Sequence, residues 1–269
     1  MPNHITNKVK LIGSQEKINV ILNAVKYDDG ELGTLDFNKL IQMPESLNMT
    51  SGSIETTAIN AYLSALNPQT EDMGIEKLDI KAFMELCENL SITRYLSSYE
   101  GLMTSQQIIE SIKYDKDQNF QSIIELGQKY GDNFQKYGYT TWYDWAINNW
   151  GTKWNSYDSE PVEENTLTFN TAWARAIPVI SKLAEKYSDM DIEYQWADED
   201  IGSNVGRAYY SSGELTEEYI PVSQSKEAYE MAADIIGLDL SECGLKYSKS
   251  TGNYEYIEEC TNEISQEMG

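Results

Sequence analysis

The chain opens with an alternating segment that is followed by a helical stripe. Residues 5–12 alternate between two faces, one of which holds Ile5, Asn7, Val9 and Leu11, and this predicts a strand. Ser14 is placed to cap the next helix, whose apolar side chains recur at i, i+3, i+4 and i+7. These apolar positions are Ile18, Ile21, Leu22 and Val25. Residues 35–43 predict a return strand that Pro44 ends, so the first 45 residues are expected to form strand, helix and strand.

A second pattern of the same kind begins at residue 166. Residues 166–173 alternate and predict a half-buried strand, with Trp173 on its inward face. Pro178 suits the first turn of the helix that follows. The next alternating segment is apolar on one side and acidic or amidic on the other, as in a sheet with one solvated face. Its apolar positions are Ile192, Tyr194 and Trp196.

Two more strands and a closing helix complete this part of the chain. Residues 205–210 and 214–222 alternate and are separated by a short turn at 211–213, which predicts a hairpin. Ser225 is a helix-capping residue, and Gly237 is placed to end the helix that Ser225 begins.

The two patterns together predict an α+β fold: a ferredoxin-like antiparallel sheet of the split βαβ type, with its helices on one face. We assign residues 1–45 and 151–237 to this sheet domain and residues 46–150 to a helical insertion. Residues 238–269 form an acidic C-terminal tail with a hairpin signal at 250–253. The helices predicted in the insertion cover 55–66, 78–90, 105–126 and 140–149.

Charge changes this picture more than any other part of the composition. The chain carries 44 acidic and 20 basic side chains, a net charge of −24, and residues 155–269 hold 24 of the acidic and 7 of the basic ones. So acidic a chain repels the phosphates of nucleic acid and is attracted to basic surfaces. We therefore expect a basic partner and no direct binding of nucleic acid.

The composition also bears on the compartment. No apolar run approaches the ~18 residues of a membrane span, and residues 1–13 lack the apolar core of a secretory leader. The three cysteines, Cys87, Cys243 and Cys260, are widely spaced, which fits a reducing compartment and no disulfide framework. These features predict a cytoplasmic protein that has no membrane contact.

Catalytic and cofactor-binding motifs are missing from the sequence. His4 is the only histidine, so His-rich zinc sites and most Ser–His or Cys–His pairs are excluded. The sequence contains no CxxC, no GxxxxGK[ST] and no GxGxxG motif. We predict no catalytic residue and no bound cofactor.

An acidic cluster around residues 189–200 raises the question of a metal. Its last part, residues 198–204, combines oxygen ligands with a glycine turn but lacks the acid, glycine and glutamate spacing of an EF-hand loop. Paired carboxylates also serve glycosidases, although a chain this acidic forms such pairs by chance. A polar turn between two strands accounts for the cluster, and no metal site is predicted.

All six tryptophans fall between residues 142 and 196, and the densest run is TTWYDWAINNWGTKWNSYD. One interpretation is an aromatic pocket or a binding hot spot, since Trp and Tyr anchor interfaces. The other is a seam at which the insertion packs against the sheet. The candidate patch consists of Trp142, Trp145, Trp150, Trp154 and Tyr157.

Several segments also carry a resemblance to a family. These segments are MPNHITNKVKLIG at 1–13, DFNKLIQMPESL at 36–47, NWGTKWNSYD at 149–158, FNTAW at 169–173 and ADEDIGSNVG at 197–206. In this order they resemble the YubB-type family of phage and plasmid proteins. The resemblance implies a ferredoxin-like fold and an origin on a mobile element, and it supplies no catalytic residues.

Two functional hypotheses follow. In the first, the chain is a non-enzymatic phage or mobile-element protein that binds and inhibits a defence protein of a bacterial host. The partner would be a basic nucleic-acid-binding protein, and the inhibitor an anti-CRISPR or anti-restriction mimic of DNA. Because neighbouring strands lie ~4.8 Å apart, acidic side chains on them would resemble a phosphate array. The expected acidic face consists of Asp191, Glu193, Asp198, Glu199, Asp200, Glu214, Glu217 and Glu218.

In the second hypothesis, the aromatic patch lines a pocket for a nucleotide or a signal molecule, in a binding protein or an enzyme. Phosphate groups in such a pocket would need basic residues, of which Lys153, Arg175 and Arg207 are candidates. The two hypotheses differ in where the carboxylates and the tryptophans lie in the fold.

Overall fold

The computed structural model describes residues 2–52, 54–56, 58, 59, 62, 118–161, 163 and 165–257. The chain divides into two compact units, Met1–Gln42 with Ala146–Gly269, and Met43–Trp145. Among the described helices, none is long and apolar enough to cross a membrane. The helix predicted at 78–90 and residues 105–117 of the next one lie outside the described residues.

The second unit contains a short helical turn and a long helix. The turn is η2 (Glu45–Leu47), and the helix is α5 (Gln118–Tyr137), which continues beyond the predicted end at residue 126. A further helix, α6 (Trp142–Trp150), begins in this unit and ends in the first unit. The described residues of the predicted 55–66 helix, between 54 and 62, are helical.

The first unit is built on a five-stranded antiparallel sheet with the strand order β2-β1-β3-β4-β5. The strands are β1 (His4–Ile12), β2 (Thr166–Ala172), β3 (Asp191–Asp198), β4 (Gly206–Ser211) and β5 (Glu214–Tyr219). Because β2 and β3 both run antiparallel to β1, they are parallel to each other with β1 between them. Helix α7 (Ile177–Lys186) connects them, so β2, α7 and β3 form the predicted split βαβ unit within an α+β fold.

The return strand predicted at 35–43 is not formed. Phe37–Lys39 instead make a 3₁₀ turn, η1, because the Asp36 carboxylate accepts a hydrogen bond from the backbone N–H of Asn38. The Phe37 N–H donates to the side-chain oxygen of Asn155, which ties the turn to a remote segment of the same unit. Leu35 and Phe37 are fully buried, so their alternation reflects burial in a turn rather than strand pairing. The first 45 residues therefore contribute only one strand to the sheet.

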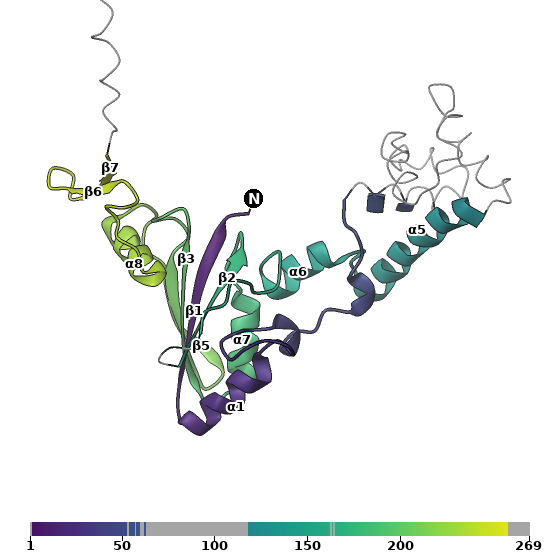
Figure 1. Cartoon of the computed structure of the whole chain (residues 1–269), viewed down its shortest axis with the longest axis horizontal. Helices are drawn as coiled ribbons and strands as arrows, with labels where there is room; N and C mark the ends of the chain where they lie inside the picture. The colour runs from purple at the N-terminus through teal and green to yellow at the C-terminus, as the bar shows by residue number, and fades with distance from the viewer. Residues whose placement is uncertain are drawn as a thin grey trace, which may run out of the picture. The chain divides into compact units, whose positions relative to one another are not determined.

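Two helices cover one face of this sheet, here called the inner face. Helix α1 (Gln15–Val25) buries the four predicted apolar side chains, although the Ser14 side chain at its start makes no capping hydrogen bond. Helix α7 carries Pro178 in its first turn and buries Val179, Ile180, Leu183 and Ala184. The hydroxyl of Ser181 on α7 lies 3.3 Å from the hydroxyl of Tyr210, an inner-face residue of β4. Figure 1 shows both helices on the same side of the sheet.

The third helix, α8 (Lys226–Ile236), lies on the opposite, outer face (Figure 1), so the prediction that all helices share one face was wrong. Small side chains permit this placement, since Ala228 and Ala232 pack against Ala197 of β3. The predicted ends of α8 are confirmed: the Ser225 hydroxyl accepts from the N–H of Ala228, and Gly237 ends the helix at φ 81°. Beyond it, β6 (Leu245–Ser248) and β7 (Asn253–Tyr256) form the hairpin predicted in the tail.

A buried polar network ties the central strands together. The Asn7 side chain on β1 donates to the Phe169 carbonyl and, at 2.9 Å, to the Thr171 hydroxyl, both on β2. Its amide oxygen accepts from the Tyr194 hydroxyl of β3 at 2.7 Å. Asn7, Thr171 and Tyr194 are fully buried, and no buried polar side-chain atom in the described part lacks a partner. Burial raises the pKa of Tyr194, because the charged form would be desolvated there.

Candidate protein-binding surface

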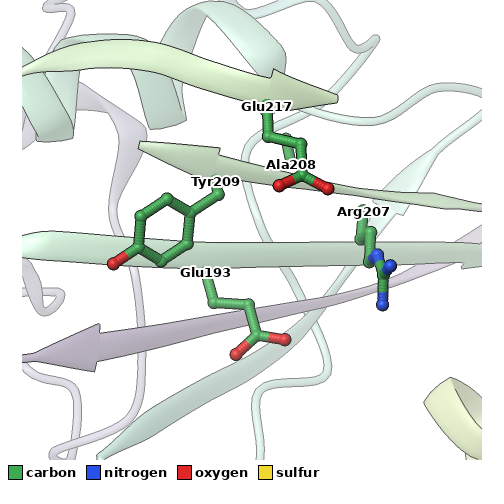
Figure 2. Close-up of a pocket in the computed structure, with 5 residues that line it drawn as sticks. All are labelled: Glu193, Arg207, Ala208, Tyr209 and Glu217. Carbon is green, nitrogen blue, oxygen red and sulfur yellow. The ribbon is translucent and has the colours of Figure 1, made fainter. Parts of the chain in front are cut away.

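The outer face of the sheet is open to solvent where α8 does not cover it. Directly paired residues point to the same face, so the register places Lys10, Glu193, Tyr209 and Glu217 in one row across four strands. The neighbouring row holds Lys8, Gln195, Arg207 and Tyr219. A pocket here is lined by Glu193, Arg207, Ala208, Tyr209 and Glu217, which Figure 2 shows as sticks. Cations and anions are therefore mixed on this face.

The structure divides the eight acidic residues that the sequence placed on one face. Glu193 and Glu217 do lie on the outer face, and Asp191 lies at its end. A hydrogen bond to Asp191 raises the pKa of Tyr209, since the acidic side chain disfavours the phenolate. Glu218 points to the inner side, opposite Ala208, and forms an ion pair of 3.1 Å with Arg175.

Asp198 is the clearest departure from the expected face. It pairs with Ile5, so it points to the inner side, and it is only 6 % exposed. Its carboxylate accepts hydrogen bonds from the side chains of Asn3 and Asn204 and from the N–H of Asp200. These bonds shape the 198–204 turn, and Asp198 is therefore a structural residue. Within the described ranges no group of three or more His, Cys, Asp or Glu could hold a metal ion.

The remaining members of the acidic set lie in exposed turns. Glu199 and Asp200 follow β3 directly, and the Glu199 N–H donates to the carbonyl of His4. Glu214 begins β5 next to the predicted turn, in which Ser212 and Gly213 have φ values of 54° and 85°. Two consecutive left-handed residues are typical of the tight hairpin turns that match strand twist.

Helix α8 adds an acidic stripe that the sequence analysis missed. Glu227, Glu230 and Asp234 are exposed and follow each other at i, i+3 and i+7, opposite the buried face of the helix. A hydrogen bond between Glu227 and Tyr219 connects this stripe to the end of β5 and raises the pKa of Tyr219. The amphipathic pattern of 226–236, which predicted the buried face of the helix, also places these acidic residues on the opposite face.

The residues of the predicted aromatic patch are divided between the two units. Trp142 and Trp145 belong to the Met43–Trp145 unit, whereas Trp150, Trp154 and Tyr157 belong to the sheet unit. Trp150 is a core residue: it is 4 % exposed, and its indole N–H donates to the Ile41 carbonyl at 2.9 Å. Trp173, expected on an inward strand face, lies just beyond β2 at φ 69° and is 53 % exposed.

A smaller aromatic cluster lies at the β2 side of the outer face. The Tyr157 hydroxyl and the His4 Nδ1 are 2.9 Å apart, and the rings of Tyr157 and Trp154 meet edge to face. Burial raises the pKa of Tyr157 to about 12, and the charges of Asp158 and Glu199 add to this effect. The cluster is thus polar and aromatic, and its Tyr157 side chain is uncharged near neutral pH.

Comparisons with known proteins bear on the sheet domain. Residues 149–239 match the family model of the ferredoxin-like domain in Api92-like protein. No curated protein matches the chain. A crystal structure of the Api92 protein from Yersinia pseudotuberculosis is similar at 10 % identity and a TM-score of 0.36, over 82 % of this chain and 99 % of that one. The family match confirms the ferredoxin-like fold that the sequence predicted.

Proposed function

We propose that this chain is a non-enzymatic protein whose acidic surface binds a basic nucleic-acid-binding protein of a bacterial host and inhibits it. The observation that carries the proposal is the exposure of the acidic side chains in the sheet unit. Between residues 155 and 257, every described Asp and Glu is exposed except Asp191, Glu193 and Asp198. Charge of one sign at this density attracts a cationic partner and repels nucleic acid itself.

The fold concentrates part of this charge at one side of the sheet. Glu214, Glu217 and Glu218 lie on β5, the terminal strand, and the α8 stripe meets that strand at the Glu227–Tyr219 hydrogen bond. We call these β5 and α8 carboxylates the acidic side of the domain. The mixed charges of the outer face fit a DNA-like array less well, because Lys8, Lys10 and Arg207 interrupt it.

The inhibitory role and the host setting rest on the resemblance to phage and plasmid proteins. A protein from a mobile element gains if it occupies the nucleic-acid groove of a host nuclease, as an anti-CRISPR or anti-restriction protein does. The alternative, a nucleotide or signal-molecule site at the aromatic patch, has weaker support, since Trp145 and Trp150 are buried.

Affinity purification from a bacterial host tests this proposal. The bait is the full chain, compared with a variant in which Glu217, Glu227, Glu230 and Asp234 are all changed to Lys. A control variant carries the same charge change at Asp29, Glu31, Glu160 and Glu163, which are exposed elsewhere in the sheet unit. We expect the wild type and the control to retain a basic nucleic-acid-binding protein that the first variant loses.

A second readout addresses inhibition. The retained partner should no longer bind its DNA or RNA when the wild-type chain is present, and its recovery should fall steeply with salt. Retention of the same partner by the acidic-side variant at low salt would contradict the proposal, and so would a retained partner that still binds nucleic acid.

A further inference from the structure

The strand β5 forms one of the two ends of the sheet, and we propose that it is a pairing edge for an extended, basic segment of the partner protein. This inference rests on the proposed function and adds to it where and how the partner binds. We call residues 214–222 the β5 edge. The partner segment would add a sixth strand, so that backbone hydrogen bonds supply affinity and alternate side chains supply specificity.

The backbone of the β5 edge is available for such pairing. β5 pairs with β4 on one side only, and no strand in the described part of the chain lies on its other side. About half of the N–H and C=O groups of an antiparallel edge strand point away from its neighbour. Pro221 ends the row of donors, so the edge offers pairing groups from Glu214 to Ile220.

Exposed apolar side chains follow the same stretch. Leu215 is 48 % exposed, Ile220 is 53 % exposed and Val222 is 79 % exposed. Exposed apolar side chains on an uncovered edge favour pairing with another strand. Together with the carboxylates of β5, these exposed apolar side chains fit a partner segment in which basic and apolar residues alternate.

The carboxylates identify the occupant as basic and argue against a second copy of this chain. Glu217 points to the outer face, so the basic side chains of an added strand would meet it there, whereas Glu218 on the inner side is already paired with Arg175. An antiparallel pair of two β5 strands in a register centred on Glu217 and Glu218 would bring these residues close to the same residues of the other copy, and like charges opposite each other destabilise a strand pair.

The strand is also held in place before any partner binds. The Arg175 guanidinium lies 4.0 Å from the centre of the Trp196 ring and pairs with Glu218 at 3.1 Å. Thr216 donates a hydrogen bond to the Tyr209 carbonyl at the bulge between Tyr209 and Tyr210. A preordered strand loses less conformational entropy when it pairs, which favours binding.

The test uses the full chain and the synthetic peptide Lys-Val-Lys-Val-Lys-Val as the probe. Binding is measured by calorimetry, and backbone amide exchange of the protein is followed by NMR with and without the peptide. We expect the outward-facing amides of 214–220 to exchange at least about tenfold more slowly at saturation. A second peptide, with Pro in place of each Val, keeps the charges but lacks the amide N–H at every substituted position, and we expect it to bind about tenfold more weakly.

A pair of variants separates local from general charge effects. Glu217→Lys should weaken binding of the Lys-Val peptide about tenfold, whereas Asp29→Lys, with the same charge change in the exposed turn after α1, should change it less than about twofold. Both substitutions are at exposed positions, so thermal unfolding should show that each variant is folded.

The contradicting outcomes are distinct. Peptide binding without slower exchange in 214–220 would overturn edge pairing while leaving the binding of a basic partner in place. No binding of the Lys-Val peptide would overturn the edge proposal too, and the affinity purification then decides the proposed function separately. Slower exchange in 214–220 that depends on protein concentration alone would assign the edge to a second copy and overturn the basic occupant.

Discussion

The two ends of the sheet differ in how their backbone is satisfied. At the β2 end, residues 157–161 and Glu163 run alongside the strand, and Asn170 and Tyr157 exchange backbone hydrogen bonds of 2.8 and 3.1 Å. Glu160 adds a third bond to the Thr168 carbonyl. At the β5 end, no described strand follows, and every residue from Glu214 to Glu218 is exposed. Because the β2 edge is covered and the β5 edge is open, any pairing with a further strand is expected at β5.

The largest loss of stability is expected at Asn7, which links β2, the strand at the covered edge, to the centre of the sheet. Asn7→Leu removes the donor to Phe169 and Thr171 and the acceptor of Tyr194, which leaves buried polar groups without partners. We expect the free energy of unfolding to fall by about 3 kcal/mol, measured by urea denaturation.

The matched substitution on β5, at the open edge, should hardly change the free energy of unfolding. Thr216→Val removes one exposed hydroxyl on β5 and its bond to the Tyr209 carbonyl, and should change stability by less than about 0.5 kcal/mol. Equal losses for Asn7→Leu and Thr216→Val would mean that the two halves are equally constrained.

An intermediate loss of stability is expected at the link between β5 and the core. Arg175→Ala removes the stacking on Trp196 and the ion pair with Glu218, and should lower the free energy of unfolding by about 1–2 kcal/mol. Arg207→Ala is the control, because Arg207 is exposed and its guanidinium lies 5.5 Å from the centre of the Tyr219 ring. Urea denaturation in which both variants lose the same stability would argue against a specific fastening of β5 by Arg175.

Sequence patterns identified the β-strands well, because in β1 to β4 every second side chain is buried and burial follows the two-residue period of a strand. The four strands of the C-terminal part and the 211–213 turn follow from alternation and turn residues alone. The 35–43 segment failed because a buried turn shows the same alternation, and its Asn155 partner is remote in sequence. Trp173 was misplaced by one residue, since strand β2 ends at Ala172.

The candidate surface was harder to predict from the sequence than the strands were. Asp198 and Glu199 are neighbours of the same type, yet one is buried among hydrogen-bond donors and the other is exposed. Which acid takes the structural role depends on Asn3 and Asn204, and those contacts exist only in the folded chain. Likewise, the open edge at β5 depends on strand order, which alternation does not determine.

A further small stability effect is expected in the segment that covers β2. Tyr157→Phe removes the hydroxyl that contacts His4 and should cost about 0.5–1 kcal/mol at neutral pH. The pKa of Tyr157 is raised from 10.0 to about 12 in the folded chain, so its contribution is full below pH 10 and is lost as pH rises through 12. Carbon-13 NMR of the Tyr rings should show this late titration, and a Tyr157 that titrates near pH 10 would contradict burial of the covering segment.

Native-state hydrogen exchange of the free, full-length chain tests the difference between the two edges most directly. We predict that the Asn170 amide exchanges as slowly as the sheet core, because its N–H donates to the Tyr157 carbonyl. The outward-facing amides of β5 should exchange close to the rate of an unprotected amide, because no described strand receives them. Equal protection at β2 and β5 in dilute protein would show that the β5 edge is already occupied, and would contradict its assignment as a free pairing edge.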